Sequence, residues 1–137
     1  MGLGHSIIIT TRFSDTDAMQ IIWHGNYLKY FEDGREAFGT RYDLRYMDMY
    51  KNGFTAPIVH LELDFKKSVS FNEDIRVEVK MEPTLASKLI FHYKIYNNTT
   101  HDLLCTGKTI QVFVSNDGEL QLTNPDFFVD WKNKWLK

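Results

Sequence analysis

The chain has 137 residues and a mass of 16.1 kDa, the usual size of one folded domain, so we expect a single domain over residues 1–137. It carries 16 Lys and Arg residues against 18 Asp and Glu residues, and this net charge of -2 gives no broad positive field for binding nucleic acid. The longest stretches without a charged side chain have 11 residues, whereas a membrane-spanning helix needs about 20. We therefore expect neither a nucleic-acid-binding protein nor an integral membrane protein.

The compartment is predicted from the first residues and from cysteine usage. The start of the chain lacks a basic segment followed by an apolar one, the pattern of an export signal, so we expect a cytoplasmic protein. The single cysteine, Cys105, excludes an internal disulfide and agrees with a reducing compartment. We expect this cysteine to pack as a small apolar residue.

The predicted elements begin with one strand and one long helix. Residues 7–13 are rich in β-branched side chains, which predicts a strand. From Asn26 onward, apolar residues recur every three or four positions until Gly39, which predicts a helix that ends at this glycine. A shorter helix is predicted over residues 45–52, closed by Gly53.

After Gly53 the apolar period changes to two, the period of half-buried strands. Four strands are predicted in succession, over residues 59–66, 75–81, 89–96 and 103–114. Asn124 and Pro125 predict the N-cap and the first residue of a short last helix. One long helix against a meandering antiparallel sheet is an α+β arrangement, and its open sheet edges favour dimers or larger assemblies.

The loop between the first strand and the long helix carries residues suited to chemistry. It holds two carboxylates, Asp15 and Asp17, and one imidazole, His24. The loop leads into a helix N-terminus, where free backbone N–H groups and the helix dipole stabilise negative charge that develops on an oxygen. A carboxylate opposite these donors would be the base or nucleophile of an acyl-transfer site. Acidic residues at helix starts are also common caps, so spacing alone leaves a structural role open.

Residues 13–43 carry a resemblance to a known family. They read FSDTDAMQIIWHGNYLKYFEDGREAFGTRYD, and they resemble the opening of the hotdog-fold acyl-CoA thioesterases of the 4-hydroxybenzoyl-CoA thioesterase type, including the Tol-Pal-associated branch. The shared pattern is an aromatic residue, D-x-D, an apolar stretch, an aromatic–His pair, a small residue and N-Y. Residues 57–65, PIVHLELDF, resemble the second strand of that family. The resemblance implies a hotdog fold, an antiparallel five-stranded sheet wrapped around one long helix.

The same resemblance implies hydrolysis of an acyl-CoA thioester to a free acid and CoA, with no bound cofactor. Asp17 would attack the thioester carbonyl or activate water for that attack, and it would be the main catalytic residue. The backbone N–H near His24 would bind the oxyanion, and the His24 side chain would assist. Asn26 and Tyr27 are expected beside the substrate, where they would fix the start of the helix.

The CoA phosphates require cations, and two groups are candidates. One is the pair Lys66 and Lys67 after the second strand, where the family often places a basic residue, and the other is Lys88 beside Ser87. In a hotdog assembly the pocket lies between two subunits, so the regions of Lys67 and Ser87 would meet the Asp17 loop of the partner subunit. We therefore expect a homodimer or homotetramer.

Two alternatives to an acyl-CoA thioesterase stay open, and the first comes from a departure from the family pattern. Family members often have glycine where this chain has Gln20, and a glycine accepts a positive φ that glutamine resists. The first alternative is therefore a hotdog module that binds an acyl or CoA ligand without turnover. The second is a thioesterase for acyl carrier protein, whose D-A-M loop is partly matched by residues 17–19. An acidic carrier protein would require a basic rim, which the net charge of -2 does not favour.

Other acidic and histidine residues are weaker candidates. Glu32 and Glu36 lie one helical turn apart, the usual spacing of a solvated charged face. His60, Glu62 and Asp64 share the polar side of a strand, but the set lacks the closure of a zinc site. We therefore expect no metal.

Overall fold

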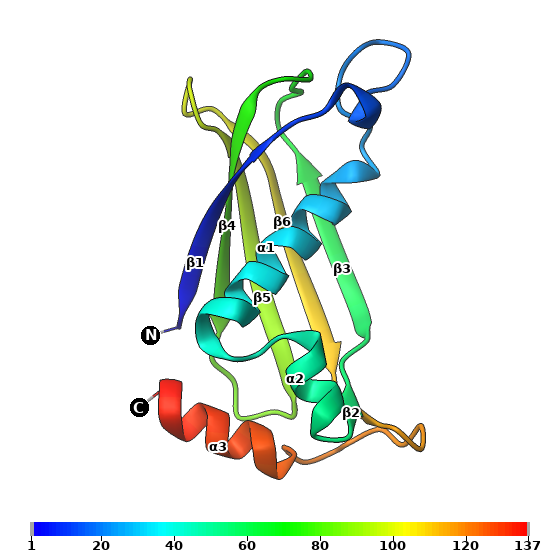
Figure 1. The fold of residues 1–137 in the computed structure, drawn as a ribbon, viewed down its shortest axis with the longest axis vertical. Coiled ribbons are helices and arrows are strands. Elements are labelled where there is room, and N and C mark those ends of the chain that lie inside the picture. Colours follow the sequence, from blue (N-terminus) through cyan, green and yellow to red (C-terminus); the bar gives the residue numbers. More distant parts are fainter. Residues whose placement is uncertain (1, 137) are drawn as a thin grey trace.

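The structure, a computed structural model, describes residues 2–136. Within this range five antiparallel strands form one sheet that curves around helix α1 (Asn26–Tyr42), as Figure 1 shows. The strand order across the sheet is β1-β4-β5-β6-β3. The strands are β1 Gly4–Thr10, β3 Ile58–Phe65, β4 Asp74–Glu82, β5 Lys88–Asn97 and β6 Leu103–Val112. This architecture confirms the predicted α+β class and the five-stranded sheet around one long helix.

Smaller elements close the two ends of the sheet. The short 3-10 helix η1 (Phe13–Asp15) precedes the loop that leads to α1, and α2 (Tyr46–Lys51) confirms the predicted second helix. β2 (Phe54–Thr55) pairs with β7 (Val114–Ser115), and α3 (Asp126–Trp135) lies at the end of the sheet opposite η1 (Figure 1). Among the described helices, none is both long enough and apolar enough to cross a membrane.

The core lies between α1 and the inner face of the sheet. Every second residue of β4 from Ile75 to Met81 is buried, as its period of two predicts. Phe31 of α1 stacks on Tyr93 of β5 with the ring centroids 4.3 Å apart. The same ring lies over Gly107 of β6, where a Cβ would overlap it. A glycine at this position therefore allows the close approach of the helix to the sheet.

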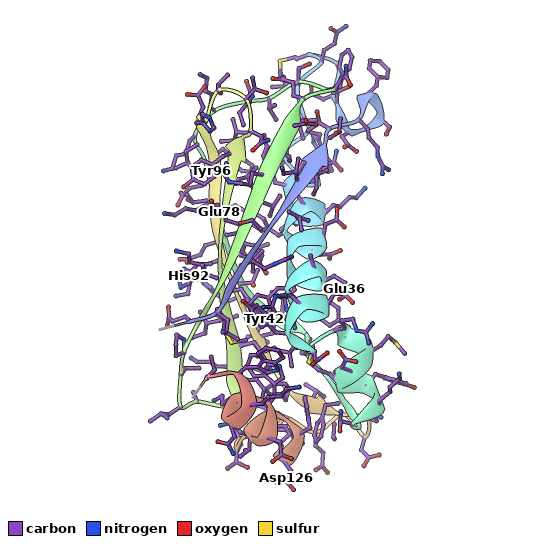
Figure 2. The ribbon with its side chains drawn as sticks, turned by 60° about the vertical axis from the view of Figure 1, so that its left-hand side comes forward. Glu36, Tyr42, Glu78, His92, Tyr96 and Asp126 are labelled. Carbon is purple, nitrogen blue, oxygen red and sulfur yellow. The ribbon has the colours of Figure 1, made fainter. Side chains whose placement is uncertain are left out.

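Figure 2 shows the two sides of the sheet. Glu78, His92 and Tyr96 extend from the outer face, away from α1, and Glu36 lies on the helix that covers the inner face. The outer face is mostly charged, whereas the inner face contributes the apolar core. This division follows from the alternation of polar and apolar residues along the strands.

Several predicted boundaries are wrong. β1 ends at Thr10 rather than residue 13, because the chain then bonds to the loop before β4: Thr11 Oγ1 donates to the Ser70 carbonyl at 2.7 Å. α1 continues past Gly39 to Tyr42, since Asp43 adopts the left-handed conformation, with a φ of 58°, that ends it. The strand predicted over residues 103–114 breaks at residue 113 and resumes as β7. The N-cap of α3 is residue 125 rather than residue 124.

The predicted meander is also wrong, because β3 does not pair with β4. β3 pairs with β6, with Leu61 opposite Thr109, and forms an edge of the sheet. Its apolar residues are more exposed than a half-buried strand predicts, since within residues 2–136 no further strand pairs with β3 and α1 covers it only in part. Between 38% and 59% of the following side chains is exposed: Ile58, Val59, Leu61 and Phe65.

Candidate active site

The loop that carries Asp17 is a tight hairpin turn. The Asp17 N–H donates to the Ile21 carbonyl at 2.9 Å, and the Gln20 N–H donates to the Asp17 carbonyl at 2.9 Å. Gln20 has a φ of 62°, the left-handed conformation that such a turn requires at this position. Ser70 Oγ donates to the Gln20 carbonyl at 2.8 Å and ties the turn to the loop before β4. Glutamine therefore accepts the positive φ that the sequence led us to doubt.

The turn also positions the Asp17 carboxylate. Its Oδ1 accepts a hydrogen bond from the Met19 N–H at 2.8 Å, which fixes the side chain on the inner side of the turn. The partly buried carboxylate borders a cavity of about 330 Å³ between the loop, the start of α1 and the end of β3. The other residues that line this cavity are Met19, Ile21, Ile22, His24, Tyr27, Phe65, Lys66, Lys67 and Ser68.

Asp15 has a different environment from Asp17. Asp15 Oδ2 accepts hydrogen bonds from the Tyr30 hydroxyl at 2.9 Å and from the Arg12 N–H at 3.2 Å, and Asp15 does not border the cavity. Burial, followed by this hydrogen bond to Asp15, raises the pKa of Tyr30. The Asp15 carbonyl accepts a hydrogen bond from Asn26 Nδ2 at 2.8 Å. Asp15 therefore holds the loop against the helix, and Asp17 is the carboxylate that reaches the cavity.

Backbone donors are available where the loop enters α1. The Asn26 N–H donates to the Trp23 carbonyl at 2.9 Å, whereas the N–H groups of His24 and Gly25 have no acceptor within residues 2–136. The exposed His24 ring lies near the rings of Trp23 and Phe65, with centroid distances of 5.0 and 6.4 Å. Free N–H groups at the positive end of a helix dipole attract a negatively charged oxygen.

Tyr27 and Asn26 follow each other on α1 but have separate surroundings. Tyr27 lines the cavity and packs against Phe65, with ring centroids 5.3 Å apart. Burial raises the pKa of Tyr27 to about 12, so its hydroxyl stays neutral and keeps its proton to donate. Asn26 is buried outside the cavity lining, where its amide is held by the Asp15 carbonyl.

The predicted CoA-binding residues divide between the two ends of the sheet. Lys67 borders the same cavity as Asp17 of its own chain, and its Nζ contacts Asp102 Oδ2 at 2.8 Å. Ser87 and Lys88 lie at the opposite end, where Ser87 Oγ donates to the Thr123 carbonyl at 3.0 Å. The structure therefore brings Lys67 to Asp17 within one chain, whereas Ser87 and Lys88 lie far from this cavity.

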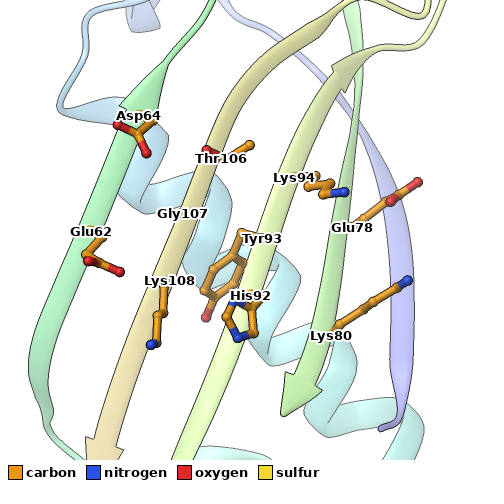
Figure 3. Close-up of a pocket in the computed structure, with 10 residues that line it drawn as sticks. All are labelled: Glu62, Asp64, Glu78, Lys80, His92, Tyr93, Lys94, Thr106, Gly107 and Lys108. Atoms are coloured by element: carbon orange, nitrogen blue, oxygen red, sulfur yellow. The ribbon is translucent and has the colours of Figure 1, made fainter. Parts of the chain in front are cut away.

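A second hollow, of about 430 Å³, lies on the outer face of the sheet, as Figure 3 shows. Its walls alternate in charge, with Glu62, Asp64 and Glu78 beside Lys80, Lys94 and Lys108. Its lining residues all belong to β3, β4, β5 and β6, so the start of α1, with the backbone donors found beside Asp17, does not border it. Among the described residues, no group of three or more His, Cys, Asp or Glu side chains is placed to hold a metal ion.

The sequence pattern did not single out two polar residues of α1 that the structure shows to be important. Tyr30 anchors Asp15, and Arg35 is 1% exposed within the core. Both lie on the apolar stripe of the helix, and a polar residue on such a stripe is the signal by which they could have been found.

Known proteins match almost the whole chain. The thioesterase-like superfamily matches residues 11–132. YneP of Bacillus subtilis (strain 168), named as a proposed acyl-CoA thioesterase, is 29% identical over 129 residues, which cover 94% of this chain and 93% of YneP. The solved DHNA-CoA thioesterase from Staphylococcus aureus is 27% identical, with a TM-score of 0.84 over 97% of this chain and 89% of that one. The solved 4-hydroxybenzoyl CoA thioesterase from Pseudomonas sp. strain CBS-3 has a TM-score of 0.80 at 20% identity, over 93% of this chain and 98% of that one.

The superfamily match extends from the loop before α1 to the last helix. The matched segment therefore contains the Asp17 turn, the start of α1 and four of the five strands of the sheet, β3 to β6, and it begins just after β1. The hotdog fold and the class of thioester hydrolase, both predicted from the resemblance of residues 13–43, are confirmed. On this evidence of sequence and fold together, the chain belongs to the thioesterase-like superfamily.

Proposed function

We propose that the protein hydrolyses acyl-CoA thioesters to a free acid and CoA, with Asp17 as the catalytic carboxylate. One observation carries this proposal: Asp17 and the start of α1, with its free N–H groups, border the same cavity. A thioester needs a nucleophile on its carbonyl carbon and donors for its oxygen, and these two features supply them. The names of the relatives, a DHNA-CoA thioesterase and a 4-hydroxybenzoyl CoA thioesterase, support CoA rather than a carrier protein as the donor.

Two routes fit a carboxylate at this position. In the first, Asp17 takes a proton from water, the resulting hydroxide adds to the carbonyl carbon, and the C–S bond breaks as the CoA thiolate takes up a proton. In the second, the carboxylate adds directly, expels the thiolate and forms an anhydride that water then hydrolyses. In both routes the N–H groups of His24 and Gly25 would stabilise the oxyanion, and the His24 ring would orient water.

The rim of the cavity suits the phosphates of CoA. Lys66 and Lys67 follow β3 beside the Asp17 turn and provide two positive charges. Lys67 would exchange its present contact with Asp102 for a phosphate, which has more negative charge and more acceptor oxygens. Such an exposed contact is weak, typically below about 1 kcal/mol, and it would tune affinity more than turnover.

We also propose that the active form is at least a dimer formed along β3. The free edge of β3 and its exposed apolar side chains are suited to antiparallel pairing with a second copy. Ile58 and Lys88 lie at the same end of the sheet, because Gln111 and Val112 of β6 pair with them. Antiparallel pairing would carry that end of the partner subunit to the Phe65 end of β3. Ser87 and Lys88 of the partner subunit would then approach the Asp17 cavity.

The cytoplasmic location remains a prediction, supported by the lone Cys105.

The role of Asp17 is tested with two matched substitutions in one loop. Asp17→Asn keeps an oxygen for the Met19 N–H, and Asp15→Asn keeps an oxygen for Tyr30, so both variants retain the loop contacts. We expect Asp17→Asn to reduce kcat for acyl-CoA hydrolysis by about 100-fold or more, the range of a lost general base. Asp15→Asn should retain most of the turnover. Full activity of Asp17→Asn, measured by release of the CoA thiol, would remove Asp17 from the mechanism.

The dimer is tested by a charge on the exposed edge of β3. Leu61→Lys places a cation at the centre of the edge, where pairing with a second copy would put two lysines close together. We expect this variant to elute as a monomer in size-exclusion chromatography and to lose activity. A monomeric variant with the wild-type kcat would contradict the proposal that a second copy completes the site.

A further inference from the structure

Another cavity lies between α1 and β3, farther along these two elements than the Asp17 cavity. It has a volume of about 240 Å³, larger than the engineered cavity of about 150 Å³ that admits a benzene molecule in another protein. Its walls are mostly apolar, with a few polar side chains among them. The lining residues are Leu28, Phe31, Glu32, Arg35, Tyr46, Ile58, Leu61, Tyr93 and Thr109. A few converging polar groups in an apolar cavity are typical of a site for a small organic group.

Arg35 is the unusual member of this lining. Its guanidinium is buried, with Nε donating to Gln111 Oε1 at 3.3 Å and Nη1 donating to the Leu44 carbonyl at 3.0 Å. Nη2 is also buried, and it has no acceptor within residues 2–136. Burial lowers the pKa of Arg35, although a guanidinium stays charged under ordinary conditions. A buried positive charge with an unused donor, Nη2, therefore borders the cavity.

No carboxylate of the described residues neutralises this charge by a direct ion pair. Glu32 is exposed and lines the cavity without an ion pair to the guanidinium. Glu36 is near enough to favour the charged form of Arg35, but it makes no ion pair with it, and its Oε2 is buried without a donor. The faces of the guanidinium rest on the rings of Phe91 and Tyr46, at 4.6 and 5.1 Å from the ring centroids. An unpaired buried charge is costly, and an anion that enters the cavity would lower this cost.

The Arg35 cavity follows the Asp17 cavity along α1 and β3. Tyr27 lines the Asp17 cavity, and the next residue, Leu28, lines the Arg35 cavity. On β3 the two cavities are bordered by Phe65 and by Leu61. Tyr27 and Arg35 are separated by roughly 12 Å along the helix axis, at about 1.5 Å per residue. An acyl group bound at Asp17 therefore needs only a moderate length to reach Arg35, in its own subunit or across the β3 edge.

We propose that the Arg35 cavity binds a carboxylate at the far end of the acyl group, so that the preferred substrates are CoA monothioesters of dicarboxylic acids. This inference rests on the proposed thioesterase function and specifies its substrate class. The carboxylate accepts hydrogen bonds from Arg35 Nη2, while the middle of the acyl chain contacts the apolar wall. An acyl group with a terminal methyl leaves the guanidinium unpaired, and the enzyme discriminates against it.

The first experiment compares two substrates of equal chain length on the wild-type protein. Octanoyl-CoA ends in a methyl group, and suberyl-CoA ends in a carboxylate. We expect kcat/KM for suberyl-CoA to be at least about tenfold higher, the effect of one hydrogen bond to a charged group. A shorter and a longer matched pair locate the chain length that reaches Arg35. Equal kcat/KM values within every pair would overturn the inference, whereas failure to hydrolyse any CoA thioester would overturn the proposed function instead.

Variants at exposed residues near the cavity avoid the risk of unfolding the core. Glu32→Gln removes an exposed negative charge that lines the cavity, and it should raise the preference for suberyl-CoA by about two- to fivefold. Asp33→Asn makes the same charge change on the next residue, which is exposed and does not line the cavity, so it should leave the preference unchanged. Equal effects of the two variants would point to a general charge effect and contradict the inference.

Arg35 itself is tested with a binding measurement that does not depend on turnover. In the Asp17→Asn background, we expect suberyl-CoA to raise the melting temperature more than octanoyl-CoA at the same concentration. Arg35→Met, if its circular dichroism shows a folded protein, should abolish this difference, and Arg35→Lys should retain part of it. An unchanged difference in folded Arg35→Met would show that the carboxylate is bound elsewhere. If Arg35→Met does not fold, the wild-type substrate pairs and Glu32→Gln decide the matter.

Discussion

The left-handed conformation of Gln20 leads to a direct prediction on stability. Gln20 has a φ of 62°, and its exposed side chain makes no hydrogen bond within residues 2–136, so replacing it by glycine removes no side-chain contact of this kind. The turn is held by backbone hydrogen bonds, which Gln20→Gly retains. The substitution therefore isolates the cost of a Cβ in the left-handed region.

Two opposing terms set the size of the effect. The left-handed conformation costs a non-glycine residue about 1–2 kcal/mol, which glycine does not incur. Glycine gives the unfolded chain more freedom, which lowers the free energy of unfolding by about 0.4–1 kcal/mol. We therefore expect the free energy of unfolding of Gln20→Gly to exceed that of the wild type by about 0.5–1 kcal/mol, which raises the melting temperature by roughly 3 °C for a domain of this size.

Urea unfolding followed by tryptophan fluorescence measures this gain. Two other substitutions by glycine provide values of the free energy of unfolding for comparison with Gln20→Gly. Ala18→Gly lies in the same turn without a positive φ, so it should lower the free energy of unfolding. Asn72→Gly replaces a residue with a φ of 57°, but asparagine tolerates this conformation, so the gain should be smaller than for Gln20→Gly. A loss of stability in Gln20→Gly similar to that in Ala18→Gly would refute the left-handed assignment and the path of the turn.

Three further predictions concern the core and its ionisable groups. Gly107→Ala places a Cβ against the ring of Phe31 and should lower the free energy of unfolding by about 1–3 kcal/mol in urea, with Phe31→Leu restoring part of the loss. Tyr30→Phe removes the 2.9 Å hydrogen bond to Asp15 and should cost about 1–2 kcal/mol in the same assay. Burial raises the pKa of the Cys105 thiol from 9.0 to about 12. The unfolded chain therefore releases this proton first, and the contribution to stability, complete below pH 9, is lost as the pH rises toward 12. The thiol should react with DTNB only after unfolding, and rapid reaction of the folded protein would contradict its burial.

The sequence predicted the elements whose cause is local. The apolar period of 3.6 residues located α1, and the period of two located β4, because both periods can be recognised within a single segment of the sequence. Strand order depends on pairing between distant segments, and no local pattern specifies it. β3 pairs with β6, with Leu61 opposite Thr109, although β4 follows β3 along the chain. The predicted end of α1 was also wrong. The helix continues through Gly39, and Asp43, a residue type that less often adopts the left-handed conformation than glycine, ends it.

The site was predictable as a segment but not as a set of contacts. The sequence located the acidic loop and the helix start; its residue pattern alone left Asp15 and Asp17 as alternatives, and only the family resemblance selected Asp17. Their difference comes from Tyr30, which lies 15 residues farther along and binds Asp15. At Gln20 the sequence raised a doubt that the structure removes. Backbone hydrogen bonds within the turn outweigh the preference of glutamine for a negative φ. In each case the decisive interaction connects residues that the pattern does not relate.

The contrast between β3 and β4 shows what an alternating pattern specifies. Both strands alternate apolar and polar residues, yet Val77 and Val79 of β4 are at most 1% exposed, whereas Val59 and Leu61 of β3 are 59% and 38% exposed. An alternating pattern states that one face needs an apolar cover, and it does not state which molecule provides the cover. For β4 the cover is α1 of the same chain. For β3 the cover from α1 is incomplete: Tyr27 packs against Phe65, but Val59 and Leu61 remain exposed, and the Asp17 cavity opens beside this partly covered strand. A second copy on β3 would therefore satisfy the pattern and close the site in one step, which is the physical reason to connect assembly with activity in this protein.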